Sequence, residues 1–220
     1  HPDDAEFGTA GTVAKLTSDG KEVVYCVASD GSKGSSDPNA TAEGLITTRK
    51  SEQWDAAKIL GVKDVCFLDF PDAMLEPNME LRRAIAGAIR RYKPDVLICQ
   101  CPTRDLNLIA FAQHPDHLAT GEAALAAAYP TSRDRMTFPE LLSQGLEPHG
   151  VREVWVVGSG STDHYIDISE TLDKKAEALR AHASQLGDRD TNAFVRERAK
   201  QVGEPSGIPY AEGFKRLPMP

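Results

Sequence analysis

The chain has 220 residues and a formal net charge of −8, from 25 basic and 33 acidic residues. This length predicts one domain over residues 1–220, and an apolar content of 40% is enough for a full hydrophobic core. The acidic balance, without a stripe rich in Lys or Arg, argues against nucleic acid as the main partner. No apolar run approaches the ~18 residues that a membrane span needs.

Strand-like and helix-like segments alternate along the chain. Helices are predicted at Ala5–Leu16, Thr47–Leu60, Met79–Tyr92, His117–Tyr129, Ser169–Gln185 and Asp190–Val202. Strands are predicted at Lys21–Ala28, Asp64–Leu68, Asp95–Gln100 and Val151–Val157. Strands that are separated by helices of this length indicate βαβ units, and therefore an α/β fold with a mostly parallel sheet. The first helix has no strand before it, and we expect that strand to lie ahead of residue 1.

Cysteine usage bears on the compartment and on the kind of metal site. The four cysteines are Cys26, Cys66, Cys99 and Cys101, and they contain no C-x-x-C pair. A cysteine zinc site or a disulfide framework is therefore not expected, and free thiols indicate the reducing cytoplasm.

Two short motifs carry groups that can do chemistry: His1-Pro2-Asp3-Asp4-Ala5-Glu6 and His114-Pro115-Asp116-His117. Two His and one Asp can hold a zinc ion and leave a position open for water. Each motif alone is typical of an ordinary turn. Because both fall where a predicted strand gives way to a helix, they are expected at the same edge of the sheet, and together they favour a metal-dependent hydrolase.

Within the two motifs, the spacing of the residues suggests which chemical role each one has. His1 and Asp4 are three residues apart, which can bring both side chains to one face of a helix start. Asp3 then stays off the metal and can act as a general base. One of His114 and His117 could bind the metal while the other faces the reacting carbonyl. Asp116 could hydrogen-bond the ring of His114 and fix its tautomer.

Other polar features are interpreted as structural. For His149, His164 and His182 we expect surface or packing roles. The segments Ser29–Pro38 and Gly158–Ser161 lack the lysine of a phosphate-binding loop and are interpreted as ordinary loops. No G-x-S-x-G motif supports a serine hydrolase.

These motifs resemble the two signatures of the LmbE-like, or PIG-L-type, zinc-dependent N-acetylglucosaminyl deacetylases, and the resemblance covers most of the chain. Weaker matches are Arg49 with Glu52, Leu60-Gly61-Val62, Asp72, Lys175 with His182-Ala183-Ser184-Gln185, and Tyr210-Ala211-Glu212-Gly213-Phe214. The resemblance implies a Rossmann-like α/β fold, with a mostly parallel sheet and helices on both faces.

Site residues follow from the resemblance position by position. It implies one zinc ion per chain, bound by His1, Asp4 and His117. Asp3 would be the general base. His114 would be the general acid or oxyanion stabiliser, held by Asp116. Arg49 and Asp72 fall where family members contact the sugar or its substituent.

The sequence therefore predicts a zinc-dependent hydrolase that removes an acetyl or other acyl group from an amino-sugar conjugate of the N-acetylglucosamine type. Two alternatives stay open: a metal-dependent amidase that acts on a non-sugar natural product, and a non-catalytic metal- or sugar-binding module. Asp3 and His114 favour catalysis, because a binding module would need neither. The expected partner is a small amino-sugar conjugate, and a homo-oligomer is compatible with the sequence.

Overall fold

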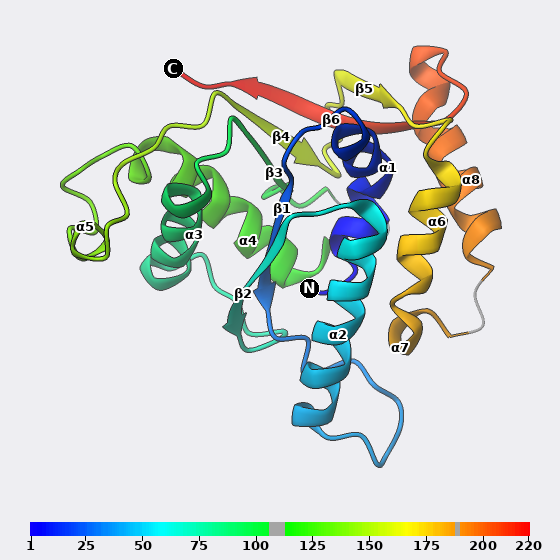
Figure 1. The fold of residues 1–220 in the computed structure, drawn as a ribbon, viewed down its shortest axis with the longest axis horizontal. Helices are drawn as coiled ribbons and strands as arrows, with labels where there is room; N and C mark the ends of the chain where they lie inside the picture. The colour runs from blue at the N-terminus through cyan, green and yellow to red at the C-terminus, as the bar shows by residue number, and fades with distance from the viewer. Residues whose placement is uncertain (106–112, 188–189) are drawn as a thin grey trace. The chain divides into compact units, whose positions relative to one another are not determined.

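The computed structural model describes residues 1–105, 113–187 and 190–220. These residues form two compact units, which can be followed by colour in Figure 1. The first contains His1–Asp72 and Tyr165–Gly213, and the second contains Ala73–His164 and Phe214–Pro220. Residues far apart in the sequence therefore share a unit.

The first unit combines a small parallel sheet with a group of helices. Strands β1 (Val24–Ser29) and β2 (Asp64–Phe70) pair in parallel, with Cys26 opposite Cys66. Three of its helices, α1, α2 and α6, contact one another, as Figure 1 shows. The helices of this unit are α1 (Asp4–Ser18), α2 (Ala42–Leu60), α6 (Leu172–Arg180), α7 (Ala183–Leu186) and α8 (Thr191–Gly203), followed by the 3₁₀ turn η3 (Glu204–Ser206).

The core of this unit is built from small and branched side chains. Alanines on α1 and α2 let these helices approach closely, while valines of β1 and β2 fill the space against the sheet. The buried cluster consists of Ala10, Val13, Ala14, Tyr25, Val27, Ala56, Ala57, Leu60, Val65 and Ala178.

In the second unit, β3 (Val96–Gln100) and β4 (Glu153–Val157) are parallel, and β6 (Ala211–Pro218) runs antiparallel to β4. Strand β5 is His164–Asp167, of which Tyr165–Asp167 belong to the first unit. The helices are α3 (Met79–Tyr92), α4 (Pro115–Ala126), the π-helical turn η2 (Ala127–Thr131) and α5 (Glu140–Ser143).

Helix ends follow their sequence signals. The Thr41 side chain accepts the Gly44 N–H at the start of α2, and Gly61 ends that helix with φ 74°. The Asn78 side chain accepts the Leu81 N–H at the start of α3. The side-chain caps Thr41 and Asn78 satisfy backbone N–H donors that have no partner within their own helix.

Close packing positions α4, which carries the second motif. A Cβ atom on Gly121 would lie 2.4 Å from the carbonyl oxygen of Gln100 at the end of β3. Only glycine permits this approach, so the helix backbone rests directly on the strand end. Beyond Gly121, the small residues Ala123, Ala124, Ala127 and Ala128 are all buried.

The predicted α/β fold is confirmed, with some corrections. The pairing is not all parallel: β1 and β2 are parallel, as are β3 and β4, but β6 runs antiparallel to β4. Strands β5 and β6 were not predicted. The β6 run Ala-Glu-Gly-Phe-Lys-Arg-Leu-Pro lacks strict alternation and places a charged Glu212 in the interior, which hides the strand pattern. The predicted helix Ser169–Gln185 is two helices, α6 and α7, interrupted at His182. Within the described ranges, no helix is both long enough and apolar enough to cross a membrane.

A buried ion pair is inserted against the middle of α1. The Lys175 ammonium lies 2.5 Å from the Glu212 carboxylate, and both side chains are nearly inaccessible to water. The same carboxylate accepts the backbone N–H groups of Gly11 and Thr12, at 2.9 and 2.7 Å. Lys175 also donates to the carbonyl oxygen of Phe7. The ion pair therefore supplies partners for backbone groups within the helix.

Gly11 makes room for this arrangement. A Cβ atom at this position would lie 2.8 Å from the Cβ of Ile168. The segment that carries Ile168 can therefore approach α1 only where α1 has no side chain.

We predict that Glu212→Gln lowers the free energy of unfolding by about 3–5 kcal/mol, because it leaves the buried Lys175 ammonium without its counter-charge. The exposed pair of Lys63 and Glu22 provides the matched control, since Glu22→Gln should change stability by less than about 1 kcal/mol. Urea unfolding measures both. Equal costs for the two variants would contradict this account of the buried pair.

Candidate metal centre and active site

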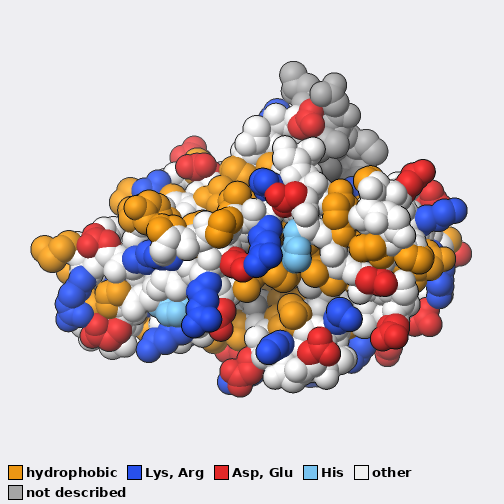
Figure 2. Space-filling model, turned by 90° about the horizontal axis from the view of Figure 1, so that it is seen from above, with side chains coloured by type: hydrophobic (Ala, Val, Ile, Leu, Met, Phe, Trp, Pro, Cys, Tyr) orange, Lys and Arg blue, Asp and Glu red, His pale blue; other side chains and the backbone are white. Residues whose placement is uncertain are grey.

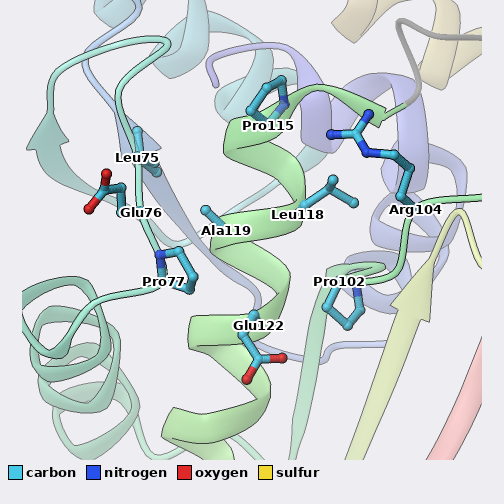
Figure 3. Close-up of a pocket in the computed structure, with 9 residues that line it drawn as sticks. All are labelled: Leu75, Glu76, Pro77, Pro102, Arg104, Pro115, Leu118, Ala119 and Glu122. Atoms are coloured by element: carbon cyan, nitrogen blue, oxygen red, sulfur yellow. The ribbon is translucent and has the colours of Figure 1, made fainter.

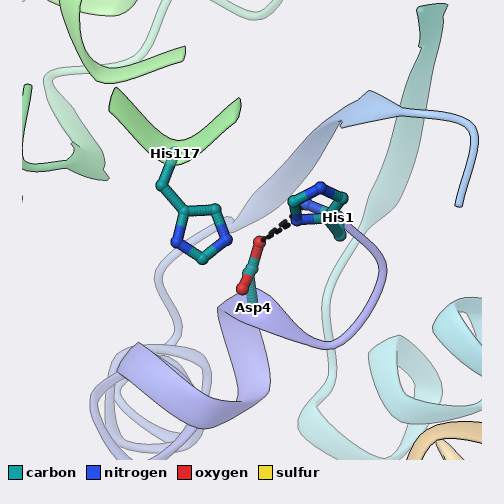
Figure 4. Close-up of side chains that lie close together, drawn as sticks. All are labelled: His1, Asp4 and His117. Atoms are coloured by element: carbon teal, nitrogen blue, oxygen red, sulfur yellow. Dashed lines mark hydrogen bonds and ion pairs between the residues drawn. The ribbon is translucent and has the colours of Figure 1, made fainter. Parts of the chain in front are cut away.

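The first motif stands at the start of α1, where the His1 imidazole faces two carboxylates. Its Nδ1 lies 3.1 Å from Asp4 Oδ2, the contact dashed in Figure 4, and its Nε2 lies 3.1 Å from Asp72 Oδ1. The side chain of His1 is 13% exposed and that of Asp72 is 8% exposed. Each ring nitrogen thus has a carboxylate oxygen within reach.

Electrostatics at His1 favour positive charge. Burial alone would lower the pKa of the imidazole, but the hydrogen bonds and charges of Asp4 and Asp72 outweigh burial and raise the pKa to about 11. Burial also acts to raise the pKa of Asp72, yet His1, the Lys33 amide and Arg49 together hold it below its usual range. An environment that favours positive charge in this way also suits a metal cation.

Asp3 has an unusual backbone conformation. It occupies the N-cap of α1 with φ 93°, in the left-handed region that residues other than Gly, Asn and Asp rarely adopt. Its N–H donates to Gln53 Oε1 at 3.2 Å. Burial and the neighbouring Asp4 charge raise the pKa of the Asp3 carboxyl to about 8, against the lowering effect of His182 and His1. A carboxyl with a raised pKa beside a candidate metal ligand is typical of a catalytic base.

A buried hydrogen-bond network holds the turn at Asp3. Gln53 Nε2 donates to both Glu6 oxygens, at 3.0 and 3.2 Å, and His182 Nε2 lies 3.0 Å from Glu6 Oε2. All three side chains are completely buried. The expectation of a packing or surface role for His182 missed its polar contact, and Gln53 and Glu6 had no predicted role. One signal in the sequence could have indicated that Glu6 is buried. Glu6 lies one turn before the buried Ala10 and therefore on the same face of α1.

Arg49 and Asp72 lie together beside this site. Arg49 Nη1 donates to the carbonyl oxygens of Gly31 and Lys33, at 2.7 and 2.6 Å, and lies 3.7 Å from Asp72 Oδ2. The Asp72 carboxylate also accepts the Lys33 N–H at 3.1 Å. Both side chains are buried in the first unit, and their contact with a substrate stays a prediction.

The second motif lies at the start of α4 in the second unit. His114 is the N-cap residue and Pro115 the first helical residue, as the His-Pro pattern predicts. His114 Nδ1 accepts the Asp116 N–H at 3.2 Å, which leaves Nε2 to carry the proton of the neutral ring. His117 follows on the first turn of α4, where Figure 4 draws it, and its ring centroid is 5.6 Å from that of His114.

Asp116 anchors a neighbouring loop of the same unit. Its carboxylate accepts the N–H groups of Ala73 and Leu75, at 2.7 and 3.2 Å. The same carboxylate lies 3.9 Å from His114 Nδ1. Asp116 thus fixes the loop that precedes α3, and its role in holding the ring of His114 stays a prediction.

A hollow of about 320 Å³ lies along the first turns of α4. Its lining is mostly apolar with a few charged groups, and Figure 3 shows these side chains around the helix. It is lined by Leu75, Glu76, Pro77, Pro102, Arg104, Pro115, Leu118, Ala119 and Glu122. Such a mixed lining suits a small molecule with both polar and apolar parts.

The remaining two histidines make one polar contact and one packing contact. His149 Nε2 lies 2.8 Å from the carbonyl oxygen of Pro94, and the His164 ring is 4.7 Å from that of Trp155. On the face drawn in Figure 2, acidic and basic side chains are interspersed with apolar ones.

Comparison with known proteins places these motifs in a family. Residues 1–128 match the family model described as "PIG-L: GlcNAc-PI de-N-acetylase". A diacetylchitobiose deacetylase of Thermococcus kodakarensis is 32% identical, over 99% of this chain and 80% of the relative. A Bacillus anthracis protein named "Probable N-acetyl-alpha-D-glucosaminyl L-malate deacetylase 2" is 31% identical, over 87% of this chain and 80% of the relative. The structure of N,N'-diacetylchitobiose deacetylase from Pyrococcus horikoshii, in complex with an inhibitor, superposes with a TM-score of 0.91 at 30% identity, over 99% of this chain and 81% of that one.

We predict that Gln53→Met lowers the free energy of unfolding by about 1–3 kcal/mol, because it keeps the length of the side chain but removes the partners of Asp3 N–H and Glu6. The matched control is Gln201→Met on α8, where the exposed Gln201 side chain donates to Glu197; this variant should stay within about 0.5 kcal/mol of the parent. Chemical denaturation measures both. A Gln53→Met variant as stable as the control would show that the network does not hold the turn.

Proposed function

Because the chain belongs to the GlcNAc-PI de-N-acetylase (PIG-L) family, we propose that it is a zinc-dependent hydrolase that removes the acetyl group from an N-acetylglucosamine-type conjugate. The observation that carries this proposal is the pairing of His1 with Asp4 beside a partly buried Asp3, in a chain whose relatives are named deacetylases over nearly its whole length. The small-molecule partner would be the amino-sugar conjugate.

The donor set suits a divalent metal ion. His1, Asp4 and His117 are the proposed ligands, two imidazoles and a carboxylate. Ligand atoms about 2.0–2.2 Å from a tetrahedral zinc ion lie roughly 3.3–3.6 Å apart. The 3.1 Å between His1 Nδ1 and Asp4 Oδ2 is close to this separation, so the two atoms could share an ion with little movement.

Protons are handled by the chain's own residues. Zinc, when bound, would supply Lewis acidity that makes water a nucleophile near neutral pH and polarises the amide carbonyl. The Asp3 carboxylate would accept the proton of the attacking water. His114 would donate from Nε2, the nitrogen that keeps its proton when Nδ1 accepts the Asp116 N–H, to the developing oxyanion or the leaving amine.

The raised pKa of Asp3 fits this role when a cation is near. Burial and Asp4 raise the pKa to about 8, whereas a divalent cation held by Asp4 would favour the carboxylate form and lower it.

Free thiols at all four cysteines support a reducing compartment such as the cytoplasm.

Metal content and substrate class can be tested together. Elemental analysis of the purified protein should find about one zinc ion per chain, and release of free amine from diacetylchitobiose or from an N-acetylglucosamine–malate conjugate should stop on chelation and return with zinc. A folded protein that binds no metal would contradict the proposal. Bound zinc with amine release only from non-sugar amides would favour the alternative amidase, and bound zinc with no turnover would favour a binding module.

Asp3→Asn tests the general base. Asparagine tolerates the left-handed backbone at this position, so the fold and the zinc content should persist while kcat falls by about 10²–10⁴-fold. Asp37→Asn, on an exposed loop, is the control and should leave kcat unchanged. Parent-level turnover in Asp3→Asn would remove Asp3 from the base role.

A further inference from the structure

The His1 imidazole has a carboxylate on each side, but only one ring nitrogen can bind a given metal ion. The other nitrogen must then carry the proton and donate it to a neighbour. Nδ1 faces Asp4 and Nε2 faces Asp72, both at 3.1 Å. Which side takes the metal depends on what else surrounds the two carboxylates.

The surroundings of Asp72 disfavour a metal ion on that side. Its Oδ2 already accepts the Lys33 N–H and lies 3.7 Å from the buried Arg49 guanidinium. A divalent cation between Asp72 and His1 would lie close to this fixed positive charge, with little water to screen the repulsion.

Asp72 is also held too firmly to adapt to a metal. Its backbone N–H donates to Asp30 Oδ1 at 3.1 Å. Arg49 is itself fixed by the carbonyl oxygens of Gly31 and Lys33. The carboxylate therefore has a set position and a neutralising partner, which are the properties of a hydrogen-bond acceptor that orients another group.

We propose that Asp72 is a positioning residue that accepts the Nε2–H of His1, and so presents the Nδ1 lone pair to the metal ion shared with Asp4. This inference rests on the proposed function, because it concerns the same metal. It gives Asp72 a role inside the protein, beside the substrate contact that the sequence predicts. Arg49 acts one step further out, by holding the Asp72 carboxylate against the ring.

The role has a chemical consequence for metal binding. A carboxylate that accepts the far N–H of a ligating imidazole fixes the tautomer and makes the ligating nitrogen more basic. Loss of such a partner weakens metal binding by about 10–100-fold in metal sites generally. A residue that only touches the substrate would change KM and leave metal affinity as it is.

The test measures zinc affinity in Asp72→Asn by competition with a chromogenic chelator of known affinity. We expect the dissociation constant for zinc to rise by about 10–100-fold, with circular dichroism like that of the parent. Asp69→Asn is the matched control, because this nearby carboxylate is half exposed and pairs with Lys50; its zinc affinity should equal that of the parent. Unchanged affinity in Asp72→Asn together with a higher KM would overturn the inference and support the substrate contact.

A second measurement needs no variant and decides the question if Asp72→Asn does not fold. Nitrogen-15 NMR of the zinc-loaded parent protein distinguishes the metal-bound ring nitrogen from the protonated one. The inference expects zinc on His1 Nδ1 and the proton on Nε2, and the opposite assignment would overturn it. A parent protein that binds no zinc would instead refute the proposed function, so the two failures are distinguishable.

Discussion

The first unit depends on one constraint: the carboxylates that α1 buries must find partners, because water does not reach them. Glu6 accepts hydrogen bonds from Gln53 and lies 3.0 Å from His182 Nε2; these partners come from α2 and from the junction before α7. Glu212 is paired with Lys175 and bound to backbone amides of α1. These contacts tie four distant chain segments to one helix, and the candidate metal ligands stand at its first turn. Charge pairing in the interior thus positions the start of α1.

The histidine motifs illustrate how one short sequence pattern can hold different tasks. Asp3 and Asp4 are adjacent, yet the left-handed turn at Asp3 gives the two carboxyl groups different neighbours. Asp4 lies against the His1 ring, whereas the backbone of Asp3 is fastened to Gln53. The surroundings, more than the residue types, separate a proposed ligand from a proposed base.

Local sequence signals predicted most elements of the fold and the residues of both motifs. Helix periodicity and the stop at Gly61 act over a few positions, so they can be recognised along the chain. The predicted helix Thr47–Leu60 nevertheless begins five residues after the observed start of α2 at Ala42, because the Thr41 cap was not recognised. The network of Gln53, Glu6 and His182 could not be predicted in this way, because its members are brought together only by packing. For the same reason β6 was missed: its buried Glu212 is intelligible only beside Lys175, 37 positions earlier.

Gly11 shows what this arrangement costs the helix that carries the site. Glycine is roughly 1 kcal/mol worse than alanine inside a helix, but an added methyl group would collide with Ile168. The substitution that normally stabilises a helix, glycine to alanine, would therefore displace the segment that carries Ile168 if it were made at Gly11. Helix propensity therefore favours alanine at position 11, whereas packing against Ile168 requires glycine. The close approach of the Ile168 segment shows that packing decides the residue at this position.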